Sequence, residues 1–262
     1  LGLWSVIKMN DDGGPLDFAA AGACAAIACL TNTVLLPFGL AVPIVSWLFA
    51  RNKVRSLGRI ACYLGIMIPL YALWPLRNHS VFGSWIMGST AGAGHTFYLH
   101  LIIPEEIAGT PAQNDITARD PVILSAPEMM TPAERERYYW KAGVKHVRED
   151  PLAYARLLSW RLFRDWWRLA PRPRSYAHSF ETLRWISLLS DGWIVPLGLL
   201  GLIALGLRSR ELFWGRLFVA CASAPFILIV TMLRYRLSIM PVMIISACAV
   251  LHRAAALALK RP

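Results

Sequence analysis

Five long apolar blocks constrain the fold of this chain more than any other feature of its sequence. They carry few charged side chains and cover residues 16–50, 60–74, 188–207, 212–233 and 237–259. A stretch of about 20 apolar residues is long enough to cross the hydrocarbon core of a bilayer as an α-helix. Only 16% of the 262 residues are charged, against about a quarter in a typical soluble domain. The sequence therefore predicts an all-α integral membrane protein.

The first apolar block contains a break, which raises the expected number of crossings to about six. The polar run TNT at residues 31–33 divides this block into two apolar segments. We therefore expect three transmembrane helices in residues 1–75 and three in residues 188–262. Between them, residues 76–187 form one large polar loop region, in which we expect amphipathic helices.

Lysine and arginine in the short connections predict the orientation, because the cytoplasmic loops of membrane proteins are enriched in both. Residues 51–59, which we expect to form a loop, hold four basic residues and no acid, and residues 208–216 and the C-terminal tail are also mainly basic. With six crossings, these places are cytoplasmic and residues 76–187 are extracytoplasmic. The net charge of +11 then reflects this loop bias, and it does not indicate nucleic-acid binding.

Two helix-start signals occur within the large loop region. The run TPAE at residues 131–134 is a capping box with proline at the first helical position, and it predicts a helix to about Arg148. Asp150 and Pro151 predict a second helix, to about Leu169. This second helix carries an apolar and a basic stripe side by side, formed by Leu158, Leu162, Trp166 and Leu169 and by Arg161, Arg164 and Arg168. That pattern is typical of a helix in the membrane interface, and packing against the rest of the loop is the alternative.

The three residues Arg234, Tyr235 and Arg236 separate two apolar blocks. An arginine in the hydrocarbon costs about 2.5–3.5 kcal/mol on insertion scales. Two arginines held close together in a short loop can bind phosphate oxygens through their guanidinium groups. Snorkelling of both side chains to the lipid headgroups explains the same pattern equally well.

The block that ends at Trp74 is followed by a run rich in glycine, serine and threonine. Pro75 is expected to end the helix at the membrane surface, which leaves Arg77 and Asn78 at the start of the loop. The glycines that follow allow the backbone to approach a ligand closely, and an ordinary flexible loop is the alternative. Arg77 could instead pair with an outer acid, such as Glu105 or Asp120.

The stretch WPLRNHSVFGSWIMGSTAGAGHTFYLH resembles the join between a transmembrane helix and the main outer loop in membrane glycosyltransferases of the GT-C type. The nearest group is the family 39-like, polyprenyl-phosphate-sugar-dependent one, which includes protein mannosyltransferases and aminoarabinose transferases. Three further stretches are similar to the same family, at residues 20–49, 131–167 and 234–247. The chain departs from the family pattern near His100, where a Gly-Asn pair is usual, and at residues 32–33, where a basic residue and proline are usual.

The resemblance implies a glycosyltransferase of a bacterial inner membrane. It would transfer a sugar from a polyprenyl-phosphate carrier to a lipid, glycan or protein acceptor on the extracytoplasmic side. The resemblance also implies that Arg77, Asn78, Arg234, Tyr235 and Arg236 bind this donor, with the arginines neutralising the phosphate leaving group.

The catalytic carboxylate of the family lies in its first outer loop, for which this chain offers no candidate. We therefore expect no catalytic residue here, and no activity from these 262 residues alone. The sequence contains no C-x-x-C pair, so we expect neither a metal site nor a disulfide framework. No cofactor is expected. The alternative is a non-enzymatic multipass membrane protein, either a transporter or a cell-envelope assembly factor. The acids in the apolar blocks are Asp17 and Asp191, and both lie near block ends. The helices therefore show no charged relay of the kind a transporter uses.

Overall fold

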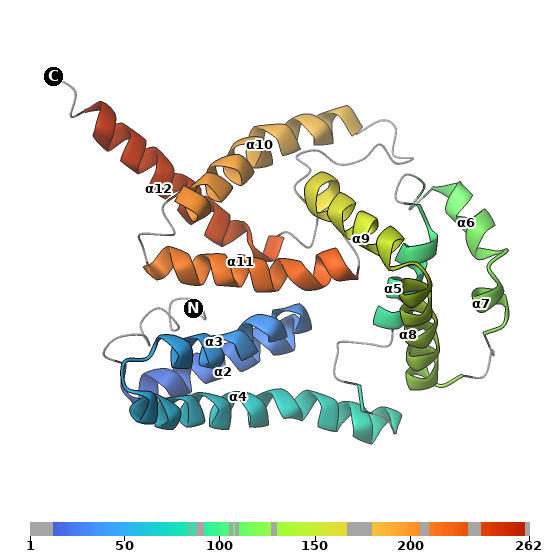
Figure 1. The fold of residues 1–262 in the computed structure, drawn as a ribbon, viewed down its shortest axis with the longest axis horizontal. Helices are drawn as coiled ribbons and strands as arrows, with labels where there is room; N and C mark the ends of the chain where they lie inside the picture. The colour runs from blue at the N-terminus through green and yellow to red at the C-terminus, as the bar shows by residue number, and fades with distance from the viewer. Residues whose placement is uncertain are drawn as a thin grey trace. The chain divides into compact units, whose positions relative to one another are not determined.

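The computed structural model shows a helical chain (Figure 1). It describes residues 13–83, 85–86, 92–104, 107, 110–126, 130–166, 180–204, 210–229 and 237–259. No strand occurs in these ranges, which confirms the all-α prediction. The chain divides into two compact units. Unit 1 comprises residues 1–89, 196–224 and 238–262, and unit 2 comprises residues 90–195 and 225–237.

Among the described residues, three helices are long and apolar enough to cross a membrane. They are α4 (Lys53–Phe82), the Trp185–Ala204 part of α10 (Phe180–Ala204), and α12 (Met240–Ala258). Three other apolar helical stretches are shorter, at Pro15–Thr31, Thr33–Phe49 and Leu212–Leu228. By length and composition, these helices support the prediction of a membrane protein.

The predicted break in the first apolar block is confirmed. Helix α2 (Pro15–Thr31) ends at Asn32, whose backbone is extended and whose side chain accepts a hydrogen bond from the amide of Val34 at 3.2 Å. That bond starts a short 3-10 turn, η1 (Thr33–Leu35), which leads directly into α3 (Leu36–Phe49). An asparagine side chain that bonds the backbone two residues ahead favours a turn over a continued helix.

Helix α4 begins earlier than predicted, so the expectation of a loop at residues 51–59 is wrong. The Asn52 side chain accepts a hydrogen bond from the amide of Arg55 at 3.0 Å and caps the helix there. The Lys53 ammonium donates to the carbonyls of Trp47 and Leu48, at 2.7 and 2.8 Å. These are among the last carbonyls of α3, where a cation is favourable. The basic residues therefore lie mostly on the first turns of a helix.

The far end of α4 also differs from the prediction, because Pro75 does not end the helix. Pro69 and Pro75 both lie inside α4, which continues to Phe82. The helix stops at Gly83, which has a φ of 64° and donates its amide to the carbonyl of His79 at 2.9 Å. Proline removes one helical hydrogen bond and can kink a helix without ending it, whereas a left-handed glycine provides a definite stop.

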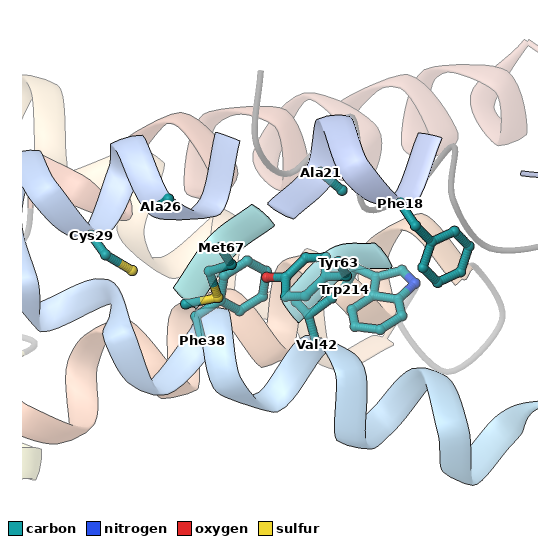
Figure 2. Close-up of a cluster of buried hydrophobic side chains, with 9 residues drawn as sticks. All are labelled: Phe18, Ala21, Ala26, Cys29, Phe38, Val42, Tyr63, Met67 and Trp214. Atoms are coloured by element: carbon teal, nitrogen blue, oxygen red, sulfur yellow. The ribbon is translucent and has the colours of Figure 1, made fainter. Parts of the chain in front are cut away.

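The core of unit 1 lies where α2 and α3 pack on α4 (Figure 2). Gly22 lets α2 approach α4 closely, because a Cβ at this position would collide with the carbonyl oxygen of Tyr63. The hydroxyl of Tyr63 donates to the carbonyl of Gly39 in α3 at 2.9 Å. Trp214, from α11 (Arg210–Leu228), completes the cluster. Its buried members are Phe18, Ala21, Ala26, Cys29, Phe38, Val42, Tyr63, Met67 and Trp214.

Small residues also bring α10 and α12 together within unit 1. A Cβ at Gly198 would lie 2.7 Å from the carbonyl oxygen of Met243, and a Cβ at Gly201 would collide with that of Ser246. Such close backbone approach at small residues is common between membrane helices, where packing is a main source of association.

Unit 2 contains α5 (Ala93–Ile102), α6 (Pro111–Thr117), α7 (Pro121–Leu124), α8 (Pro132–Glu149) and α9 (Pro151–Trp160). The predicted capping box is confirmed, because Thr131 Oγ1 accepts from the amide of Glu134 at 3.3 Å and the Glu134 carboxylate accepts from the amide of Thr131 at 2.9 Å. The predicted start of α9 is also confirmed, since Asp150 accepts from the amide of Ala153 at 2.8 Å. Helix α9 continues as a π-helical stretch, η2 (Arg161–Trp166), and the predicted end at Leu169 lies outside the described residues.

Candidate functional site

Two of the five predicted donor-binding residues, Arg77 and Asn78, lie on the last turns of α4 and not in a loop. The exposed guanidinium of Arg77 is 5.5 Å from the centre of the Trp74 ring and 5.8 Å from that of Phe82. Its Nη1 donates to Asn78 Oδ1 at 3.2 Å. Cation–π contact with rings three residues before it and five residues after it restricts the arginine without neutralising its charge.

Asn78 connects this arginine to the chain that follows the helix. Its side chain is buried, with 2% of its surface exposed, and its Nδ2 donates to the carbonyl of Ile86 at 3.0 Å. The chain therefore turns back on α4 after Gly83. Next to this turn, the rings of His79 and Trp85 stack at 4.4 Å with an angle of 6° between their planes. Asn78 thus acts as an internal support for Arg77.

The other three predicted residues, Arg234, Tyr235 and Arg236, lie outside the described residues. The helix that leads to them is described to its end, where a buried arginine of unit 2 contacts it. Arg161 is fully buried, and its Nη1 donates to the carbonyls of Ile227 and Leu228 at 3.3 and 3.2 Å. The hydroxyl of Tyr154 donates to the same Leu228 oxygen at 3.0 Å.

The second nitrogen of Arg161, Nη2, donates to the carbonyl of His100 at 2.7 Å. His100 is in the last turn of α5, and Ile227 and Leu228 are at the end of α11. The last carbonyls of a helix have no partner within it and carry partial negative charge. A fixed positive charge that reaches both helix ends is therefore stabilised there by hydrogen bonds as well as by charge.

This position of Arg161 contradicts the predicted basic stripe, in which it would face headgroups or water. Tyr154 and Arg161 are seven residues apart, so they share one face of the α9–η2 helix, with Leu157 and Leu158 between them. The prediction grouped Arg161 with Arg164 by charge. The apolar residues one turn before Arg161, Leu157 and Leu158, are the sequence signal that would have indicated its buried position.

A carboxylate occupies the start of α5, where the glycine-rich run ends. Glu136 of α8 accepts from the amide of Gly92 at 2.9 Å and from that of Gly94 at 2.6 Å, each with a different oxygen. Negative charge is favourable at a helix N-terminus. Gly94 is required by this contact, because a Cβ there would lie 2.5 Å from the backbone oxygen of Glu136. The backbone approach predicted for this glycine therefore serves a side chain of the protein itself.

Asp120, considered as a partner for Arg77, is engaged elsewhere, and Glu105 lies outside the described residues. Asp120 caps α7 by accepting from the amides of Val122 and Ile123, both at 3.0 Å, and it accepts from the hydroxyl of Tyr98 at 3.0 Å. Burial and this hydrogen bond raise the pKa of Tyr98 far above its usual range. Such a carboxylate holds its surroundings in place and is poorly suited to take a proton from a substrate.

His95, beside this network, is half-buried, and its ring lies 4.7 Å from that of Tyr139. Burial lowers the pKa of His95, and the positive charge of Arg135 lowers it further. The imidazole is therefore neutral at physiological pH. In the part of the chain that the structure describes, no group of three or more His, Cys, Asp or Glu residues could hold a metal ion.

No protein-family model, curated protein or solved structure matches this chain.

Proposed function

We propose that this chain contributes the phosphate-binding part of a membrane glycosyltransferase that uses a polyprenyl-phosphate-linked sugar. The observation that carries the proposal is the exposed Arg77 guanidinium at the end of a helix that is long and apolar enough to span a membrane, where Trp74, Phe82 and Asn78 contact it. The resemblance to the GT-C family supplies the reaction, and it also implies a role in donor binding for Arg234, Tyr235 and Arg236.

The length of α4 supports a headgroup position for Arg77. Arg55 and Arg77 are separated by 22 positions in this helix, which corresponds to about 33 Å at 1.5 Å per residue. The hydrocarbon core of a bilayer is about 30 Å thick. When Arg55 lies among the headgroups of one leaflet, Arg77 therefore reaches those of the other. Trp74 then lies where tryptophan is enriched in membrane proteins.

Glycosyl transfer from a phosphate-linked carrier is favoured by a cation beside the phosphate. The acceptor hydroxyl attacks the anomeric carbon and loses its proton to a base, while the bond from that carbon to the phosphate oxygen breaks. The carrier leaves with the bonding electrons, so its phosphate gains negative charge. Arg77 donates one N–H to Asn78, and the guanidinium has further donors for the phosphate oxygens. Stabilising charge as it develops lowers the barrier to transfer.

The proposal includes six crossings, with residues 76–187 on the extracytoplasmic side of a bacterial inner membrane. The three shorter apolar stretches would supply the crossings beyond α4, α10 and α12. Helix α2 has 17 residues, at the lower limit of about 17–25 residues for a spanning helix. The acceptor in this proposal is a lipid, a glycan or a protein.

The test is the binding of polyprenyl phosphate, the leaving group, to the full chain in nanodiscs of neutral lipid. Arg77→Lys keeps the charge but loses the planar guanidinium. A charge-assisted hydrogen bond contributes about 1.5–3 kcal/mol, so we expect the Kd to rise about tenfold or more. Arg55→Lys, at the opposite end of α4, is the matched control and should bind as the native chain does.

Arg234→Lys and Arg236→Lys are measured in parallel, because the resemblance implies that both residues bind the donor. Binding no stronger than that of phosphatidic acid, which carries a phosphate without the polyprenyl chain, would refute the proposal. A non-enzymatic membrane protein would then be the better interpretation.

A further inference from the structure

Helix α8 carries a row of exposed basic side chains that the proposed site does not use. We call this row the α8 basic stripe, and it consists of Arg137, Lys141, Lys145 and Arg148. Residues three or four apart lie on one side of a helix, so the four form a continuous surface. The opposite side of α8 packs on α5, with Tyr139 and Gly143 buried and a Cβ at Gly143 only 2.7 Å from the Phe97 ring. The stripe therefore faces away from the rest of the helix pair.

An apolar row lies along one edge of the α8 basic stripe. Trp140, Val144 and Val147 follow one another at the same helical spacing. The Trp140 ring is 4.7 Å from the Phe97 ring, yet 42% of the residue remains exposed. A basic row beside an apolar row is typical of helices that lie in a membrane interface. Tryptophan is enriched at that level of a bilayer.

The acids of α8 leave most of this positive charge in place. Glu136 accepts from the amides at the start of α5. Glu134 accepts from the amide and the hydroxyl of Thr131, at 2.9 and 2.7 Å. Glu149 is 3.7 Å from Lys145, but both side chains are well exposed, at 62% and 76%. Exposed ion pairs of this kind are weak and leave a surface open to other anions.

We propose that the α8 basic stripe and its Trp140 edge dock on the anionic headgroups of a lipid bilayer. A soluble acidic polymer would satisfy the charges but would leave the apolar row in water. A bilayer surface satisfies both rows at once. In addition, α5 follows the membrane-spanning α4 after only residues 83–92, so a membrane is the anionic surface that the helix pair meets at the highest effective concentration. This inference does not depend on the glycosyltransferase activity.

The experiment places a fluorophore on the apolar row of the full chain. Val144→Cys is introduced after the five native cysteines are replaced, and it is labelled with an environment-sensitive dye. The chain is reconstituted in nanodiscs that contain a lipid-borne quencher, with phosphatidylcholine alone or mixed with phosphatidylglycerol. We expect stronger quenching with phosphatidylglycerol, and we expect about 1 M salt to abolish the difference, because the Debye length is then only about 3 Å.

Neutralising the stripe should weaken docking in steps. Each Lys or Arg near an anionic surface raises the equilibrium constant for docking about fivefold. Lys141→Gln should therefore lower this constant about fivefold. The double variant Lys141→Gln, Arg148→Gln should lower it about 25-fold. Arg135→Gln is the matched control, because Arg135 is exposed on α8 but outside the stripe.

Equal quenching in neutral and anionic nanodiscs would overturn the proposal, as would equal effects of Lys141→Gln and Arg135→Gln. If the dye responded to soluble polyphosphate but not to phosphatidylglycerol, the docking partner of the stripe would be a soluble polyanion and not a lipid surface.

Discussion

Replacing Arg161 by lysine should loosen one of the two helix ends that Arg161 contacts, while keeping the positive charge. The guanidinium reaches the carbonyl of His100 through Nη2, at 2.7 Å, and the end of α11 through Nη1. A lysine has one nitrogen at its tip, so it can serve one of these helix ends but not both. The substitution therefore separates the effect of hydrogen-bond geometry from the effect of charge.

The expected magnitude follows from the contact that lysine gives up. A hydrogen bond to a charged group contributes about 1.5–3 kcal/mol, and the carbonyl that loses it is left without that partner. At about 1.4 kcal/mol per factor of ten, local opening of the affected helix end becomes about ten to a hundred times more frequent. The 2.7 Å contact with His100 is shorter than the two contacts with α11. We therefore expect lysine to keep His100 and to release α11.

Hydrogen exchange of the full chain in lipid measures this opening. The relevant amides are those of the last turn of α11, including Ile229, which donates to Pro225 at 2.9 Å. Their exchange should accelerate about ten- to a hundredfold in Arg161→Lys. Arg156→Lys, at an exposed position on the same helix, should leave it unchanged. Equal exchange in the two variants would refute the claim that Arg161 holds the end of α11.

Two further predictions concern α5. Gly94→Ala should destabilise unit 2 by about 1–3 kcal/mol, because its Cβ would meet the Glu136 backbone. Gly192→Ala, whose Cβ meets nothing within 4 Å, should be neutral or stabilising in the same thermal unfolding measurement, and equal losses would contradict the packing argument. His95 has a lowered pKa, so the unfolded chain binds a proton that the folded chain does not, and stability should fall as the pH drops below about 6.5. His95→Gln should reduce this fall between about pH 7 and pH 5 in unfolding experiments, and an unchanged pH profile would show that another group is responsible.

Local signals in the sequence predicted the starts of α8 and α9, because the groups that set these starts are close together in the sequence. Thr131 and Glu134 bond each other's backbone at the start of α8, and Asp150 caps α9 three residues ahead. Asn32 likewise marked the end of α2 through a bond to its near neighbour Val34. In each case the two groups that define the boundary lie within a few residues of each other.

Features that depend on distant partners were not predictable in this way. Arg161 bonds carbonyls that lie 66 and 67 residues further along the chain, so local signals did not reveal its partners, and grouping it with Arg164 by charge placed it on the wrong side of its helix. Pro75 was misread for a different reason, since proline weakens a helix locally but surrounding apolar turns can carry the helix past it. In the candidate site, Arg77 and Asn78 stay predictions from the sequence, and the bond from Asn78 to the carbonyl of Ile86 was not predicted.

The two prolines inside α4 affect how this helix adapts to the thickness of a bilayer. Pro69 and Pro75 each remove one hydrogen bond from the helical ladder, and helices bend at such positions. A rigid rod can accommodate a thinner membrane only by tilting as a whole, which displaces both of its ends. A helix with joints near one end can bend there while its longer part keeps its tilt. In the proposed six-crossing topology, this bending would keep the last turns of α4, which carry Arg77, at the lipid–water boundary as membrane composition changes.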